Sequence, residues 1–180
     1  MFSFKTIKNL AEGAAKNLAD GAVQIVQAGQ EWVDGDDDDV VLKGFKRLVQ
    51  LDGYSCGAQS AHAVLRYFGV GRSLKRTARL IGCDSDGTDW APMKRLFVKR
   101  RLGTHRMNRA RKRDLKAAID AGCPVLVAID DEGHWAVVYG YGSGKVYLAD
   151  PSLKRAKGNV VFDWSDFKDR WDGWAAVISE

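Results

Sequence analysis

Hydrophobic and polar positions along the chain recur with two different periods. From Val40 onward, apolar residues first return every three or four positions, which predicts helices near 56–68, 73–81, 89–101 and 111–121. Apolar stretches typical of strands follow at about 124–129, 134–141 and 145–150. A short helix near 164–170, opened by Asp163, and a strand near 174–178 complete the pattern. Because the helices precede the strands, we expect an α+β domain whose sheet is antiparallel.

The segment ahead of this domain carries its own helical pattern. Lys8–Ala15 is echoed by Lys16–Val23, and apolar residues in both copies fall near one helical face. This predicts an amphipathic helix over residues 1–33 that docks on a partner protein or on the main domain. The acidic run 34–39 reads as a linker, which leaves 40–180 as the main domain.

Composition narrows the class of protein. A chain of 180 residues, 46% of them hydrophobic, supports one ordinary core and an appendage. No apolar run approaches the roughly 20 residues that span a bilayer, and the first residues lack the pattern of a secretory signal. The three cysteines are widely spaced and show no metal-binding pattern. We therefore expect a cytoplasmic protein without disulfides, metal or other cofactor.

Charge is unevenly distributed. Residues 1–39 hold three lysines against eight acids, a net charge of −5, and the remaining 25 basic and 15 acidic residues leave +10. Residues 94–116 contain eleven Lys or Arg and one acid, Asp114. Such a segment can attract nucleic acid, anionic lipid or an acidic peptide. A solvated helix face is the favoured interpretation, since Phe97 is the only aromatic residue there to stack on a base.

Cys56 stands where a reactive thiol would be placed. It opens the first predicted helix, whose N-terminus offers partial positive charge and free backbone N–H groups. Both favour the thiolate, which is the nucleophilic form of cysteine. Gly57 would let a substrate backbone approach closely. Cys83 and Cys123 lack this context, and we expect them to pack in the core.

His134 and Asp150 are candidate partners of this thiol. If residues 142–144 form the turn between the two strands, Ala136 lies opposite Asp150, and His134 and Asp150 share a face as diagonal neighbours. A two-residue turn would place them on opposite faces. Histidine can move the proton of the reaction, and an acid can hold the tautomer of the imidazole. The other two histidines, His62 and His105, are expected to be structural or solvent-facing.

An oxyanion hole has candidates as well. Gln50 can add its side-chain amide to the backbone N–H of Cys56, so that two donors face a developing negative charge. We expect Gly57 and Trp135 to contact the substrate.

At these positions the chain resembles the bacteriocin-processing cysteine peptidases, which cleave double-glycine leader peptides. The resemblance covers about residues 46–178 and rests on Gln50 with Cys56–Ala58, Arg66–Gly69, Gly87–Thr88, His134–Trp135, Asp150–Pro151 and the aromatic ending around Gly173. It implies a papain-like fold and hydrolysis of a peptide bond after Gly-Gly or Gly-Ala in a leader or precursor peptide. It also implies that Cys56 is the nucleophile, His134 the base and acid, Asp150 the orienting acid and Gln50 the oxyanion donor.

The resemblance also shows differences. Family members usually form the N-terminal domain of a peptide-exporting transporter, whereas this sequence contains no transmembrane or nucleotide-binding pattern and is expected to act as a stand-alone peptidase. Two other functions stay open. One is a thiol transpeptidase or acyltransferase, because an amine can intercept the acyl-enzyme in place of water. The other is a non-catalytic module that binds a partner or, less favoured, nucleic acid through 94–116.

Overall fold

The computed structural model describes residues 39–152 and 160–180. The helix predicted over 1–33 and nearly all of the predicted linker lie outside these residues. The described helices are α2 (Cys56–Tyr67), α3 (Leu74–Leu80), α4 (Trp90–Lys99), α5 (Lys112–Asp120) and α6 (Trp164–Lys168). The described strands are β1 (Val40–Val41), β2 (Gly103–Met107), β3 (Val125–Ile129), β4 (His134–Gly142), β5 (Lys145–Ala149), β6 (Val160–Asp163) and β7 (Ala175–Ser179).

Within the described residues, seven strands form one antiparallel sheet. Its order is β2-β7-β3-β4-β5-β6, and the two-residue strand β1 pairs with β4. The antiparallel sheet and all predicted helices from Cys56 onward are confirmed, with ends that differ by one or two residues. Three strands were not predicted. Of these, β2 is an edge strand with mostly polar residues, so it lacks the apolar pattern of a strand. It forms because it pairs with β7.

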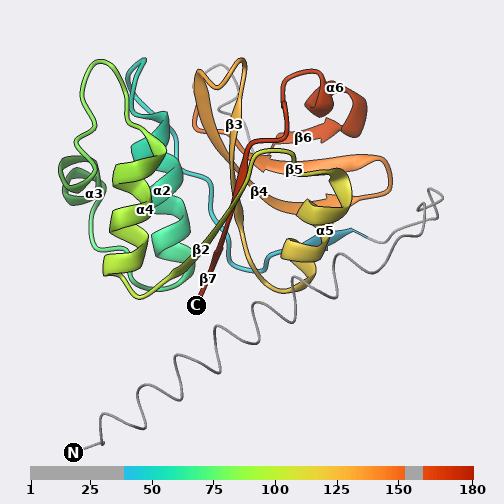
Figure 1. Cartoon of the computed structure of the whole chain (residues 1–180), viewed down its shortest axis with the longest axis horizontal. Coiled ribbons are helices and arrows are strands. Elements are labelled where there is room, and N and C mark those ends of the chain that lie inside the picture. Colours follow the sequence, from blue (N-terminus) through green and yellow to red (C-terminus); the bar gives the residue numbers. More distant parts are fainter. Residues whose placement is uncertain (1–38, 153–159) are drawn as a thin grey trace, which may run out of the picture. The chain divides into compact units, whose positions relative to one another are not determined.

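The helices lie in two groups on either side of the central strands. Figure 1 shows α2, α3 and α4 gathered on one side, while α5 and α6 lie close to the strands on the other. Helix α2 packs against β4, and small residues on it make a close approach possible, since Ala58 and Ala61 are fully buried. All five residues of β3 are buried too. The central strands therefore join the two sides in one continuous hydrophobic core.

The hairpin between β4 and β5 differs from the predicted one in its turn. Gly142 pairs with Lys145, so Ser143 and Gly144 alone form the loop. The predicted three-residue turn is wrong. A register shift between Val138 and Gly140 then adds one residue to β4, and beyond it Val137 pairs with Ala149. Such a bulge moves the side chains beyond it to the face opposite to the one that a two-residue turn alone would give.

The consequence reaches the far end of the hairpin. Continued from Val137 and Ala149, the register sets Ala136 opposite Asp150, which is the predicted pairing. His134 and Asp150 therefore share a face although the turn is even-numbered. The predicted pairing is correct although the predicted turn is wrong, because a bulge at Tyr139 supplies the residue that was predicted in the loop.

We predict that Gly140→Ala destabilises the domain by about 1–3 kcal/mol, the usual cost of inserting a group into a packed position. A Cβ at residue 140 would lie 2.8 Å from the Val40 carbonyl oxygen and 3.1 Å from Val41 Cα, so strand β1 would have to move. The free energy of unfolding from urea denaturation measures the effect. Gly53→Ala is the control, because a Cβ there meets no atom within 4 Å. Equal losses in the two variants would contradict the prediction.

Candidate active site

Cys56 is the first residue of α2 and lies at the end of a tight turn. Asp52 builds that turn, since its Oδ1 accepts hydrogen bonds from the backbone N–H of Tyr54 at 3.0 Å and of Ser55 at 2.7 Å. Ser55 is the N-cap of the helix but makes no side-chain capping bond. Cys56 thus opens a helix, as the sequence predicted, and the Gly57 backbone is among the groups that hydrogen-bond its sulfur.

His134 begins β4 and meets Asp150 directly. His134 Nε2 lies 2.7 Å from Asp150 Oδ1, and the Asp150 side chain is only 1% exposed. The backbone N–H of Ser152 donates to the same oxygen at 2.9 Å, and Arg47 Nη1 donates to the Asp150 carbonyl at 3.1 Å. Because Nε2 is engaged by Asp150, the other ring nitrogen is the one left to contact Cys56, to which His134 is hydrogen-bonded.

The surroundings of Cys56 lower the pKa of its thiol. Burial alone would raise that pKa. Hydrogen bonds from His134 and from the Trp135 backbone lower it, and the imidazolium charge and the Gly57 backbone lower it further. The net direction is downward, so the thiolate forms more readily than on an ordinary cysteine.

The same contacts act on His134 in the opposite sense. Burial disfavours its charged form, yet the hydrogen bonds with Asp150 and Cys56 and the charges of both raise its pKa to about 9. Burial also works against the Asp150 carboxylate, but the His134 hydrogen bond and the Ser152 N–H hold its pKa below the usual value. Together the shifts favour a thiolate–imidazolium pair held by a carboxylate.

Gln50 lies beside this group but is engaged locally. Its backbone N–H donates to the Pro151 carbonyl at 2.8 Å, which anchors it next to Asp150. Its side chain is buried, and Nε2 donates to the Asp52 carbonyl at 2.7 Å. Within the described residues, Gln50 Oε1 is buried without a hydrogen-bond partner. One amide hydrogen of Nε2 remains for another acceptor.

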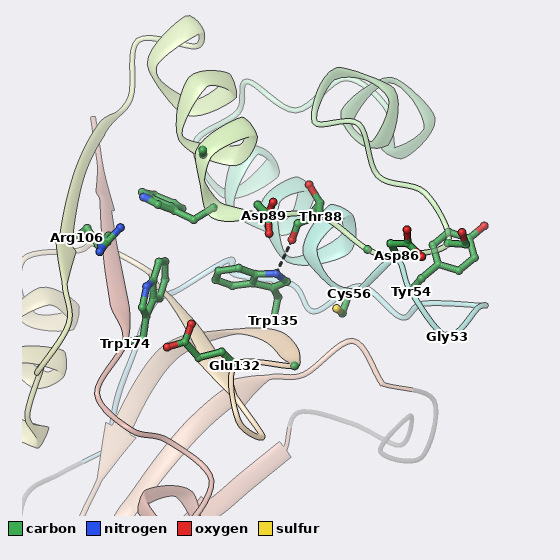
Figure 2. A pocket seen from close by; sticks show the side chains of 15 residues that line it. Gly53, Tyr54, Cys56, Asp86, Thr88, Asp89, Arg106, Glu132, Trp135 and Trp174 are labelled. Atoms are coloured by element: carbon green, nitrogen blue, oxygen red, sulfur yellow. Dashed lines mark hydrogen bonds between the residues drawn. The ribbon is translucent and has the colours of Figure 1, made fainter.

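Trp135 and Gly57 form a packed wall beside Cys56. Trp135 Nε1 donates to the Thr88 carbonyl at 2.9 Å, and the Trp135 carbonyl accepts from the Ser60 hydroxyl at 3.1 Å. A Cβ on Gly57 would lie 2.4 Å from Thr88 Cγ2 and 3.0 Å from Trp135 Cδ1. Gly57 is therefore needed for the packing of these two side chains. Figure 2 shows Trp135 lying across the cleft next to Cys56.

The cleft that opens at Cys56 has a volume of about 600 Å³. Its lining comes from the turn before α2, the segment 85–91 that leads into α4, the turn before β4, and single residues of β2 and the Trp174 loop. Residues from both sides of the domain thus surround the thiol. Among the described residues, no group of three or more His, Cys, Asp or Glu side chains has the arrangement of a metal site.

The two other histidines and the two other cysteines are not part of this hydrogen-bonded group, although the Cys83 Sγ lies 4.0 Å from the carbonyl of Tyr54 in the turn before Cys56. His62 is buried, and its Nδ1 lies 3.1 Å from Thr77 Oγ1, which ties α2 to α3. His105 is exposed on β2. Cys83 and Cys123 are free and partly buried against the core, and burial raises the pKa of each thiol.

Three positioning residues escaped the sequence analysis: Asp52, Arg47 and Ser60. Asp52 carried a usable signal, because Asp followed by Gly marks a turn in which the carboxylate bonds nearby N–H groups. Arg47 and Ser60 carried none, since their partners, the Asp150 and Trp135 carbonyls, lie 103 and 75 residues away in the chain.

Comparison with known proteins identifies relatives of this chain. The model of the peptidase C39 family matches residues 45–180. The chain is 28% identical over 131 residues to LagD, the lactococcin-G-processing and transport ATP-binding protein of Lactococcus lactis, and it spans 18% of the length of that protein.

Solved structures share the fold. One is a double-glycine motif protease from an AMS/PCAT transporter, crystallised with a leader peptide. Its TM-score is 0.64 at 20% identity, and the match covers 78% of this chain and 97% of the protease chain. The peptidase domain of ComA, a Streptococcus ABC transporter, has a TM-score of 0.62 at 18% identity and covers 75% and 98%. In the described residues of this chain, no helix combines the length and the hydropathy needed to cross a bilayer.

We predict that alkylation separates the three cysteines. Cys56 should react with iodoacetamide at lower pH than Cys83 and Cys123, because its thiol pKa is lowered and theirs are raised. His134→Ala should move the onset of Cys56 labelling to higher pH, since burial then acts without the opposing imidazolium. Mass spectrometry of labelled peptides across pH measures each thiol. An unchanged Cys56 profile in His134→Ala would contradict the electrostatic account.

Proposed function

Since this chain belongs to the peptidase C39 family, we propose that Cys56, His134 and Asp150 form the catalytic triad with which it processes leader peptides. The fold is papain-like, and the protein is a cysteine peptidase. The observation that carries the triad is the hydrogen-bonded chain from Asp150 through His134 to a thiol at a helix N-terminus. The raised pKa of His134, about 9, and the lowered pKa of Cys56 support the same assignment.

In the first step, the Cys56 thiolate attacks the carbonyl carbon of the scissile peptide bond. The His134 imidazolium donates its proton to the leaving amine, the C–N bond breaks, and an acyl-enzyme remains on the sulfur. Asp150 keeps the ring in the orientation that points its second nitrogen at Cys56, and it stabilises the imidazolium before the proton is transferred. Arg47 and Ser152 in turn hold Asp150 in place.

In the second step, neutral His134 takes a proton from water, which attacks the thioester. The C–S bond then breaks, and the thiolate–imidazolium pair is restored. Both tetrahedral intermediates carry a negative oxygen near the start of α2. The backbone N–H of Cys56 and Gln50 Nε2 are its proposed donors. The bond from Nε2 to the Asp52 carbonyl supports this role, because it holds the amide in place and leaves one hydrogen free.

We assign a preference for small residues at the cleavage site to the wall made by Trp135. Its indole is tied to Thr88 and packs against Gly57, so it leaves little side-chain space directly beside the thiol. Glycine, or glycine followed by alanine, fits such a site. The similarity to LagD, a protein named for processing lactococcin G, and the fold shared with a double-glycine protease crystallised with a leader peptide support a leader or precursor peptide as substrate.

A reducing compartment suits this nucleophile. A thiolate works only while it is reduced, and all three described cysteines are free. We place the enzyme in the cytoplasm, where precursor peptides are present before export. A peptide-exporting transporter is its proposed partner, because LagD and ComA are transport proteins.

We predict that the full chain cleaves a peptide of about 30 residues after an internal Gly-Gly and leaves its Val-Val counterpart intact. Cys56→Ala should abolish cleavage, because it removes the nucleophile. Cys123→Ser is the matched control and should keep the activity. Mass spectrometry of the products gives both the rate and the site. Cleavage by Cys56→Ala at the rate of the unchanged chain would refute the proposed nucleophile.

The oxyanion role of Gln50 predicts a separate kinetic effect. Gln50→Ala should lower kcat by about 100- to 1000-fold, the usual loss for one oxyanion donor, with little change in KM. The pH at which Cys56 is alkylated should stay unchanged, since Gln50 is not among the groups that shift its pKa. A loss of activity that comes from a raised Cys56 pKa instead would assign Gln50 to positioning of the thiol.

A further inference from the structure

The charge of the cleft is opposite to that of the protein. The chain carries +5 overall, yet Asp86, Asp89 and Glu132 line the cleft beside Cys56, and among the described lining residues Arg106 is the one cation. The Arg106 guanidinium already donates to Asn108 Oδ1 at 3.0 Å. The described lining thus holds three carboxylates and one guanidinium that is already hydrogen-bonded, so it is negative although the chain as a whole is positive. A cleft lined with one sign of charge concentrates ligands of the other sign.

Asp89 shows that this charge is presented to the cleft. It occupies the N-cap of α4 with extended backbone angles, φ −90° and ψ 166°, where an aspartate normally accepts a bond from the helix. Its side chain makes no such bond. Figure 2 shows the carboxylate directed to the side where Trp135 lies. The Asp89 carboxylate therefore does not cap the helix and faces the cleft instead.

Glu132 reaches the cleft from the opposite side, through an unusual turn. Asp130, Asp131 and Glu132 all have positive φ, between 56° and 59°. An ion pair between Asp130 and Arg170 holds the start of this turn, and the Gly133 N–H closes it on the Asp130 carbonyl at 3.0 Å. Glu132 lines the cleft while its neighbour Asp131 does not. In Figure 2 Glu132 lies across the cleft from Asp89.

Between these carboxylates lies an aromatic surface. The Trp90 and Trp174 rings are 5.5 Å apart and the Trp135 and Trp174 rings 5.0 Å apart, both edge to face. All three tryptophans line the cleft. Indole rings attract cations over their faces and also pack against the aliphatic stems of lysine and arginine.

We propose that this cleft is a subsite for a lysine or arginine side chain of the substrate, close to the scissile bond. The indoles contact the aliphatic stem, and Asp89 and Glu132 flank the charged group from opposite sides. This inference rests on the proposed peptidase function and adds a substrate class to it: the precursor carries a basic residue beside its small-residue cleavage site. A glutamate at the same position is repelled.

The test is a set of Gly-Gly peptides that differ only in the position of one residue. Lysine, its neutral analogue norleucine, and glutamate are placed in turn at each of the four positions on either side of the Gly-Gly pair. We expect one position at which lysine raises kcat/KM about 10-fold over norleucine and glutamate lowers it. Added salt should reduce the difference, because the carboxylates are exposed to solvent.

Paired variants locate the effect. Glu132→Gln and Asp89→Asn should each reduce the preference for lysine several-fold, while cleavage of the norleucine peptide changes little. Asp131→Asn is the matched control: it removes the same charge from the same turn, one residue away, and should keep the full preference. Binding of the lysine and norleucine peptides to Cys56→Ala, followed by tryptophan fluorescence, gives a readout that does not depend on turnover.

The outcomes separate the two proposals. Cleavage of the Gly-Gly peptides with no charge preference at any position would overturn the subsite and leave the peptidase function standing. An equal loss of preference in Asp131→Asn would overturn it too, because a general field of the protein would then explain the effect. Absence of cleavage in the whole set, together with equal binding of both peptides to Cys56→Ala, would overturn both proposals.

Discussion

The hydrogen bond between His134 Nε2 and the buried Asp150 carboxylate is the interaction on which the site depends. It engages one ring nitrogen and so directs the other to Cys56. It also contributes to the raised pKa of the imidazole, and the resulting cation lowers the pKa of the thiol. Because the carboxylate is almost fully buried, this charge needs its hydrogen bonds from His134 and Ser152. The charge and orientation of the imidazole and the reactivity of the thiol thus depend on one contact between neighbouring strands.

The helical side and the sheet side of the domain are joined next to this hydrogen bond. The thiol belongs to the helical side and the imidazole to the sheet, so their separation depends on how α2 rests on β4. The Ser60 hydroxyl bonds the Trp135 carbonyl one residue beyond His134, and the Trp135 indole bonds the Thr88 carbonyl ahead of α4. These two bonds hold the helices against the strand at the residue next to the imidazole. The same tryptophan forms the wall of the cleft.

Much of this arrangement could be predicted from the sequence, because each part has a local signal. Cys56 opens a clear helical pattern, and His134 and Asp150 lie at the ends of a hairpin whose spacing can be counted. The bulge at Tyr139 could not be predicted, since consecutive apolar residues fit a bulged and a regular buried strand equally well. Strand β2 and the contacts of Arg47 and Ser60 depend on partners far away in the chain, which one sequence does not reveal.

The bulge has an evolutionary consequence. With Gly142 paired to Lys145, the bulge at Tyr139 sets which way His134 points relative to Asp150. Residues added between Ser143 and Gly144 lengthen the loop and leave this pairing in place, whereas the loss of one residue at the bulge would turn His134 away from Asp150. Homologous peptidases can therefore differ in the length of this loop while the strand that leads to His134 keeps its length. An alignment of such peptidases would place its gaps at the tip of the hairpin and none near Tyr139.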